Sequence, residues 1–140
     1  MEARLTIHVD AGAMQQVRRF VTDFVANHSI AAEEQSRILI VLEELITNLE
    51  KYGYPNRSGG NAEVALQLRG TRLAIEFVDE GDPFDPLKAA APNLDSPVEE
   101  RDLGGLGIHI VRALTDEARY RRVGERNVLR LTRQVALIKS

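Results

Sequence analysis

The sequence contains no cysteine, which excludes disulfide bonds and thiolate metal sites and is compatible with a reducing compartment. It also has no run of about 18 apolar residues, so we expect no transmembrane segment. The N-terminal stretch MEARLTIHVD carries Glu2 and alternates in polarity, where a secretion signal would be continuously apolar. These absences lead us to expect a cytoplasmic protein.

The sequence also has no excess of basic residues over acidic ones. The 18 Lys and Arg residues are outnumbered by 21 Asp and Glu residues, which gives a net charge of −3. General nucleic-acid binding needs a basic face, so this balance argues against it. One basic cluster lies late in the chain, and we interpret it as the solvated face of the terminal strands, with an acidic partner surface as the alternative. Its members are Arg119, Arg121, Arg122, Arg126, Arg130 and Arg133.

What remains is the composition of an ordinary globular protein. A length of 140 residues with 44% hydrophobic residues is enough for one domain with its own core. We find no internal repeat, linker or low-complexity segment. We therefore expect a single domain over residues 1–140.

Alternating polarity predicts the strands of this domain. Residues 4–9 are expected to form an opening strand, and residues 61–79 a hairpin that turns at Gly70 and Thr71. Two further strands are expected at about 117–123 and 127–133.

Three- and four-residue spacing of apolar side chains predicts the helices. One is expected from Met14 to about Asn27, a second from Ala31 or Ala32 to Tyr52, and a third that opens with the glycines at 104–107. The loop over 80–104 is long for a compact domain, and such loops are usually functional or disordered. The order of elements predicts an α+β two-layer sandwich, with a mixed, mainly antiparallel sheet and its helices on one face.

A polar stripe on the second helix is the first candidate for chemistry. At about 100° per residue, Glu44, Asn48 and Lys51 fall close together, along with Arg37, beside a separate apolar face. A carboxylate, a carboxamide and a lysine at this spacing can hold a water or hydroxyl, a hard cation and a phosphate. A polar stripe alone is most often the wet side of a helix, so this hypothesis needs support from elsewhere in the chain.

The glycine pattern GGLG, at Gly104, Gly105, Leu106 and Gly107, is the second candidate. It opens a helix, so backbone N–H groups and the positive end of the helix dipole are available to an anion such as phosphate. A tight connection without any ligand would have the same pattern, and both interpretations remain open at this point.

The acidic turn VDEGDPFDP over residues 78–86 is the third candidate. Asp79 ends a strand, where its carboxylate can accept a hydrogen bond from an exocyclic amine, and Gly81 leaves space for a flat ring. Asp82 and Asp85 could instead belong to a calcium loop. The EF-hand spacing is absent, so we do not favour calcium.

Taken in order, EELITNLEKYGYP, FVDEGDPFDP and GGLGIHIVRAL resemble the N, G1 and G2 boxes of the GHKL-type (Bergerat) ATP-binding fold. Within that superfamily the sequence looks most similar to the stand-alone bacterial anti-sigma factor serine/threonine kinases, which have histidine-kinase-like ATPase domains. The resemblance covers roughly residues 1–133 and is sharpest over 40–112.

The resemblance implies a role for each candidate residue. Glu44 would be the catalytic base, Asn48 the Mg²⁺ ligand and Asp79 the residue that recognises adenine. Lys51, which is followed by Tyr52, would contact phosphate. Gly81 would shape the base pocket, and residues 86–103 would form an ATP lid. The turn that binds phosphate would consist of Gly104, Gly105, Leu106 and Gly107. The family commonly has a threonine near the base pocket on the last strand, where this chain has Asn127.

The function implied is transfer of phosphate from ATP, with Mg²⁺, to a serine or threonine of an anti-sigma factor antagonist by a protein that also binds a sigma factor. Relatives of this type are commonly homodimers. Two alternatives are a nucleotide-binding anti-sigma module without kinase activity and the ATPase domain of a histidine kinase. We expect the second to be the weaker, because Met1 leads directly into a predicted strand. A plain α/β domain without ligand is the third.

Overall fold

The computed structural model describes residues 2–10, 12–54, 60–88 and 103–138. Its strands are β1 (Glu2–His8), β2 (Asn61–Arg69), β3 (Arg72–Asp79), β4 (Glu117–Val123) and β5 (Arg126–Gln134), and its helices are α1 (Ala13–Asn27), α2 (Ala32–Asn48) and α3 (Leu103–Leu114). A π-helical turn, η1, occupies Leu49–Gly53, and a 3-10 turn, η2, occupies Pro86–Lys88. The strands and α-helices follow the predicted order. None of the described helices is long and apolar enough to cross a membrane.

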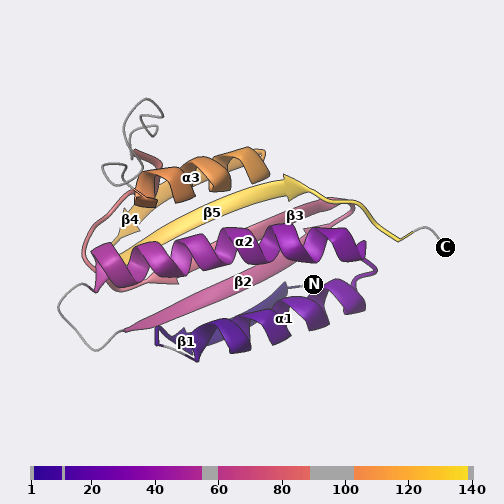
Figure 1. The fold of residues 1–140 in the computed structure, drawn as a ribbon, viewed down its shortest axis with the longest axis horizontal. Helices are drawn as coiled ribbons and strands as arrows, with labels where there is room; N and C mark the ends of the chain where they lie inside the picture. The colour runs from indigo at the N-terminus through magenta and orange to yellow at the C-terminus, as the bar shows by residue number, and fades with distance from the viewer. Residues whose placement is uncertain (1, 11, 55–59, 89–102, 139–140) are drawn as a thin grey trace.

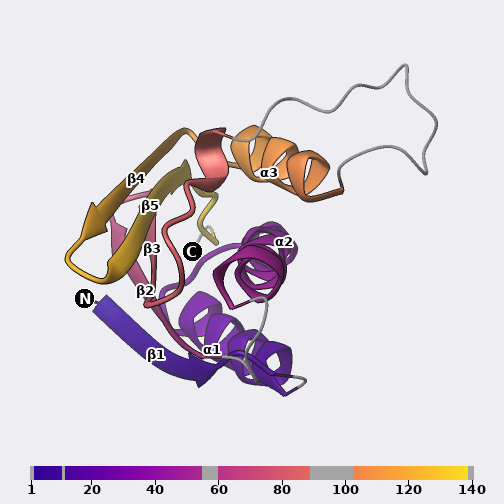
Figure 2. The same ribbon diagram turned by 90° about the vertical axis from the view of Figure 1, so that its left-hand side faces the viewer.

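The five strands form one sheet in the order β1-β2-β3-β5-β4. Every pairing between them is antiparallel, so the described sheet has none of the parallel part that the prediction allowed. Two of the pairings are hairpins, whose turns contain Gly70 and Gly124 with φ of 61° and 60°, a region that favours glycine. Figures 1 and 2 show α1, α2 and α3 on one face of the sheet, which confirms the two-layer α+β sandwich.

The alternation of β3 decides which of its side chains meet the helices. Leu73, Ile75 and Phe77 are buried, and the next residue in the same phase is Asp79, which is 8% exposed. Successive side chains of a strand point to opposite faces. The register that buries Phe77 therefore also places the Asp79 carboxylate against the helix layer.

Helix α2 ends earlier than predicted, at Asn48 instead of Tyr52. The chain continues as the π-helical turn η1, where the Tyr54 N–H donates to the Leu49 carbonyl, five residues back, at 2.9 Å. A π-helical turn is wider than an α-helical one. Lys51 lies in this turn, so the spacing of about 100° per residue that placed it beside Glu44 does not apply there.

The buried ring of Tyr54 joins three segments. Its hydroxyl donates to the Asn61 carbonyl at 3.0 Å and accepts from the Glu80 N–H at 3.1 Å. The ring also lies against Gly60, where an added Cβ would come within 2.4 Å of the ring carbon Cζ. Tyr54 thereby holds the end of η1 against the start of β2 and the end of β3.

The ends of several elements lie together at one end of the molecule. Helices α2 and α3 are in contact and run antiparallel, so the C-terminal end of α2 lies at the same end as the N-terminal end of α3 (Figure 1). Strand β3 ends there and strand β5 begins there. This arrangement brings the three sequence motifs to one end of the fold.

A buried ion pair fastens the opposite end. Glu34, in the first turn of α2, is 1% exposed and accepts hydrogen bonds from Arg37 and, at 3.2 Å, from Arg133 Nη2. Arg133 Nη1 also donates to the Leu114 carbonyl at the end of α3, at 2.7 Å. Burial alone would raise the pKa of Glu34, but the hydrogen bonds from Arg133 and Arg37 outweigh it and hold the pKa below its ordinary value.

The substitution Glu34→Gln is expected to lower the free energy of unfolding by about 3–5 kcal/mol at pH 7, because it leaves Arg133 without its buried anion. Since the pKa of Glu34 is lowered by folding, its stabilisation is fully present above the unfolded pKa of about 4.3 and is lost as the pH falls through the folded pKa. Urea denaturation over a pH series measures both effects. The exposed neighbour Glu33 supplies the control Glu33→Gln, and equal losses in the two variants would contradict the role of the ion pair.

Candidate functional site

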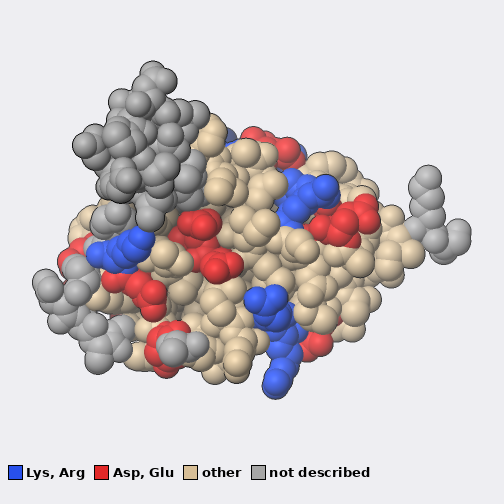
Figure 3. All heavy atoms as spheres, in the orientation of Figure 1, with Lys and Arg blue, Asp and Glu red and all other residues tan. Residues whose placement is uncertain are grey.

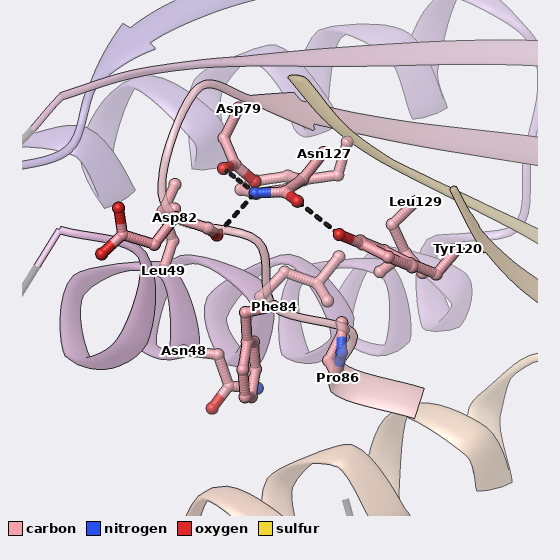
Figure 4. A pocket seen from close by; sticks show the side chains of 11 residues that line it. Asn48, Leu49, Asp79, Asp82, Phe84, Pro86, Tyr120, Asn127 and Leu129 are labelled. Carbon is pink, nitrogen blue, oxygen red and sulfur yellow. Dashed lines mark hydrogen bonds between the residues drawn. The ribbon is translucent and has the colours of Figure 1, made fainter. Parts of the chain in front are cut away.

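A cavity lies between the C-terminal end of α2, the end of β3 and the start of β5 (Figure 4). Its enclosed volume is about 40 Å³, and the empty space reaches about 400 Å³ when the adjoining open solvent is included. Its walls are largely apolar, and a few polar side chains from α2, β3, β4, β5 and the loop after β3 are set among them. The apolar side chains are Leu45, Leu49, Phe77, Phe84, Pro86 and Leu129, and the polar ones are Asn48, Asp79, Asp82, Tyr120 and Asn127. Apolar walls with a few converging polar groups are typical of small-molecule sites.

Asp79 supplies the buried charge of the cavity. Its Oδ1 accepts hydrogen bonds from the Gly81 N–H at 2.9 Å and from Asn127 Nδ2 at 2.8 Å. Among the described residues, no hydrogen bond goes to Oδ2. Burial raises the pKa of Asp79, and the hydrogen bonds from Asn127 and Gly81 and the charge of Arg122 oppose that rise. The carboxylate thus keeps one acceptor oxygen for a ligand.

Asn48 is the last residue of α2, and its side chain lines the same cavity at 4% exposure. Its Nδ2 is buried and has no hydrogen-bond partner among the described residues. Figure 4 shows Phe84 beside it. An unsatisfied buried amide is costly and needs an explanation. A ligand that enters the cavity would supply the missing partner.

Glu44 lies one turn before Asn48 and is half-buried, but it is not a wall of the cavity. Figure 3 shows acidic side chains gathered over the C-terminal half of α2, the part that carries Glu43 and Glu44. Glu44 is therefore partly accessible to solvent and lies one helical turn from Asn48, which lines the cavity.

The other predicted site residues differ in how they relate to the cavity. Lys51 is exposed in η1 and does not line it. Gly81 is buried, and its N–H and carbonyl both take part in hydrogen bonds around Asp79. Residues 104–107, the GGLG pattern, lie in the first turn of α3, and α3 packs against α2. Of the predicted lid over 86–103, residues 89–102 lie outside the described residues.

Three cavity residues, Asp82, Phe84 and Tyr120, were not assigned a role from the sequence, whereas Pro86 fell within the predicted lid and the family resemblance put Asn127 near the base pocket. Asp82, Phe84 and Pro86 come from the loop that crosses the cavity after β3, and Tyr120 and Asn127 come from β4 and β5. Phe84 had a recognisable signal, because it is an aromatic residue within a Gly-, Pro- and Asp-rich loop. Tyr120 and Asn127 depend on the strand register, which the sequence did not fix.

The side chains that line the cavity suit a planar base that carries an exocyclic amine, although the enclosed space would have to widen to admit its ring. Its ring would lie between the apolar walls while its amine donates to Asp79 Oδ2. A half-turn of the Asn48 amide would present Oδ1, a ligand suited to a hard cation. Among the described residues, no three His, Asp or Glu side chains gather to hold a metal. Mg²⁺ would therefore share Asn48 with phosphate oxygens and water, as it commonly does.

Comparison with known proteins gives relatives over nearly the whole chain. An anti-sigma F factor of Anoxybacillus flavithermus is 25% identical over 142 aligned positions, which cover 98% of this chain and 97% of the relative. A protein of Oceanobacillus iheyensis named serine-protein kinase RsbW is 25% identical, with 74% of this chain and 68% of the relative covered.

Solved structures share the fold at lower identity. The crystal structure of the RsbU and RsbW domains of a Mycobacterium tuberculosis protein superposes with a TM-score of 0.67 at 18% identity, over 100% of this chain and 35% of that longer one. The Acinetobacter baumannii histidine kinase AdeS superposes with a TM-score of 0.50, also at 18% identity, over 93% of this chain and 67% of the other. The same fold thus serves proteins with different names, and the fold alone does not choose between them.

A family model provides the assignment. The model described as the histidine kinase-like ATPase domain matches residues 7–133. This range includes the three α-helices, strands β2, β3 and β4, all of β5 except Gln134, and only the last two residues of β1. With the motifs at one end of the two-layer fold and Asn48 and Asp79 lining one cavity there, the chain belongs to the histidine kinase-like ATPase domain family.

Proposed function

We propose that this chain binds ATP in the cavity, with adenine against Asp79 and the phosphates toward Asn48 and the start of α3. The observation that carries the proposal is the pairing of two polar groups without partners in one apolar cavity. Both hydrogen bonds that the described residues give Asp79 go to Oδ1, which leaves Oδ2 as an acceptor, and the buried Asn48 Nδ2 has no partner. Both would be satisfied by one nucleotide.

The reaction proposed is transfer of the γ-phosphoryl group to a serine or threonine hydroxyl of a partner protein. Glu44 lies at the surface one turn from Asn48, where it can orient or deprotonate the attacking hydroxyl. Backbone N–H groups at residues 104–107 would hold the phosphates at the N-terminal end of α3, and Lys51 would add a positive charge near them. Mg²⁺ on Asn48 and the phosphate oxygens would neutralise the charge that develops during transfer.

The biological role proposed is that of an anti-sigma factor that phosphorylates an anti-sigma factor antagonist. The names of the relatives, anti-sigma F factor and serine-protein kinase RsbW, support this role. A phosphate on the antagonist would add a charge of about −1.5 to −2. An interface matched to a neutral hydroxyl would be weakened by that charge, which would free this chain to bind a sigma factor.

We further propose that the chain forms a homodimer through β1. This strand is at the edge of the sheet and pairs only with β2 among the described strands. A groove beside it is lined by the half-buried side chains of Leu5 and Phe20 and by the polar residues Gln15, Gln16, Arg19 and Asp23. A free strand edge next to a groove of mixed polarity suits a second copy. Light scattering after size-exclusion chromatography would give a monomer mass if this is wrong.

The substitution Glu44→Gln is expected to leave ATP affinity unchanged and to lower phosphoryl transfer by about 100-fold or more, because it removes a base without changing the cavity walls. The partner protein is recovered from the source cell by pull-down. Transfer from γ-labelled ATP is then followed on it, with phosphosite mapping of the product.

The exposed neighbour Glu43 points about 100° away on the helix, so Glu43→Gln is the matched control and should transfer normally. Unchanged transfer by Glu44→Gln would remove Glu44 from the mechanism. ATP binding by the unaltered chain without any phosphoprotein would favour the nucleotide-binding module without kinase activity.

ATP affinity is expected to fall as the pH is lowered toward the raised pKa of Asp79. The folded pKa is above the ordinary value of about 3.9, so the carboxylate gains a proton, and loses its acceptor charge, at a higher pH than an ordinary aspartate. Asp79→Asn should weaken ATP binding by about tenfold at pH 7 and lack this pH limb. The affinities of both proteins are measured by calorimetric titration over a pH series. Protonation of ATP affects the two series equally, so it drops out of the difference between them. The same pH dependence in both proteins would show that Asp79 does not bind the base.

A further inference from the structure

The strand register divides the basic cluster of β4 and β5 between the two faces of the sheet. Arg122 and Arg133 lie on the helix side, where both donate to carbonyl groups. The other four arginines are exposed and have the opposite phase from Tyr120 and Leu129, which line the cavity. They therefore lie on the open face of the sheet, away from the helices (Figure 2). These four are Arg119, Arg121, Arg126 and Arg130.

The positive charges on this open face are poorly compensated. Arg119 and Arg130 are directly opposite each other in the β4–β5 pairing, and like charges in that position destabilise a sheet. Arg130 has a distant partner in Glu76, whose Oε2 is 3.6 Å from its Nη1. The side chains of Arg119 and Arg121 form no hydrogen bond or ion pair with any described residue. These two guanidinium groups are therefore available to bind an anion.

A hollow with an apolar floor lies among these side chains. Val128 is only 8% exposed, although it has the same phase on β5 as Arg126 and Arg130 and stands opposite Arg121. The aliphatic stems of arginines can cover an apolar residue while their guanidinium groups stay in water. The hollow is lined by Arg119, Tyr120, Arg121, Val128 and Arg130.

The spacing of the two unpaired arginines indicates the shape of a ligand. Arg119 and Arg121 are two residues apart on one strand, so their side chains are about 6.6–6.8 Å apart along it. Alternate side chains of an extended peptide have the same spacing. Carboxylates at alternate positions of such a peptide can each meet one guanidinium group, whose fork of donors matches a carboxylate.

Nucleic acid fits this face less well than an acidic peptide. Glu117 precedes Arg119 on the same face of β4, and Glu76 stands opposite Arg130 in the β3–β5 pairing. A phosphate backbone that extends beyond the arginines would meet these acidic side chains. Strands β4 and β5 also place no aromatic side chain on the open face to stack a base, because their one aromatic residue, Tyr120, lines the cavity.

We propose that the open face of β4 and β5 is a docking surface for an extended acidic segment of a partner protein, with Asp or Glu at alternate positions. The arginines supply the complementary charge, and the Val128 floor lies between them. This face is on the opposite side of the sheet from the proposed ATP cavity (Figure 2). A docked segment would therefore leave the cavity open, and the proposal does not depend on ATP binding.

The probe for this surface is a fluorescein-labelled synthetic peptide in which glutamate alternates with serine. Fluorescence anisotropy measures its affinity for the full chain, and amide chemical shifts of the ¹⁵N-labelled chain locate it. We expect the shifts to change in β4 and β5, and the affinity to fall as salt is added, because salt screens exposed charges. Shift changes confined to other elements would overturn the proposed surface.

A second peptide tests the spacing. It has the same composition, but pairs of adjacent glutamates alternate with pairs of serines, so no two glutamates are two positions apart. Only one of the two arginines can then be met by an extended segment, and we expect affinity lower by about threefold or more. Equal affinity for the two peptides would overturn the fit of an extended segment.

The double variant Arg119→Gln with Arg121→Gln is expected to weaken the alternating peptide by about tenfold and to leave ATP affinity unchanged. Its matched control, Arg18→Gln with Arg69→Gln, removes the same charge from exposed arginines outside the hollow and should bind the peptide nearly as the parent does. Equal losses in the two double variants would show attraction by net charge alone and overturn the site.

The charge reversal Arg119→Glu separates binding from folding. It replaces a like-charge pair with an opposite-charge pair across from Arg130, so it should raise the midpoint of thermal unfolding while the peptide binds more weakly than to the glutamine variant. Binding as tight as in the parent would overturn the role of Arg119. Tighter binding of a single-stranded oligonucleotide than of the peptide, or self-association that the glutamine variant abolishes, would assign the face to nucleic acid or to a second copy and overturn the acidic segment.

Discussion

The buried carboxylate of Asp79 is the constraint around which this end of the molecule is organised. Strand alternation turns it toward the helix layer, and a charge in that position is tolerated only if hydrogen bonds compensate for lost water. The turn at Gly81 supplies one bond, and Asn127 supplies another from the neighbouring strand. The position of β5 and the path of the chain after β3 are therefore both tied to this one charge.

Much of the fold could be predicted because its signals are local. The alternation in β2 and β3, the apolar spacing in α1 and the turn at Gly70 each depend on residues close in sequence. The π-helical turn after Asn48 was missed because it depends on distant residues. The helical repeat does not indicate that the Tyr54 N–H donates to a carbonyl five residues back. The hydrogen-bond partners of the Tyr54 hydroxyl, Asn61 and Glu80, lie far along the chain.

Of the residues in the site, the sequence predicted those that belong to the recognised motifs. Asn48 and Asp79 were found from the sequence, and they do line one cavity. Tyr120 was not assigned, and Asn127 was placed near the base pocket only by the family resemblance. Its hydrogen bond to Asp79 spans 48 residues and depends on a strand register. A one-residue slip of β5 would turn Asn127 to the open face of the sheet, so this contact could be found only in the structure.

Strand β5 also connects the two ends of the molecule. Asn127, near its start, braces the cavity, and Arg133, near its end, joins Glu34 of α2 to the Leu114 carbonyl of α3. At the Arg133 end the buried carboxylate has cationic partners on both α2 and β5, which favours one fixed arrangement of the two helices. At the Asn127 end, Asn48 Nδ2 is buried without a partner among the described residues, and both hydrogen bonds to Asp79 go to its Oδ1. Glu34 Oε2 and Arg133 Nε also lack partners at the other end, but there the opposite charges of the two side chains compensate each other. Polar groups without partners cost stability, and only at the Asn127 end do they lie in a cavity where a ligand can satisfy them.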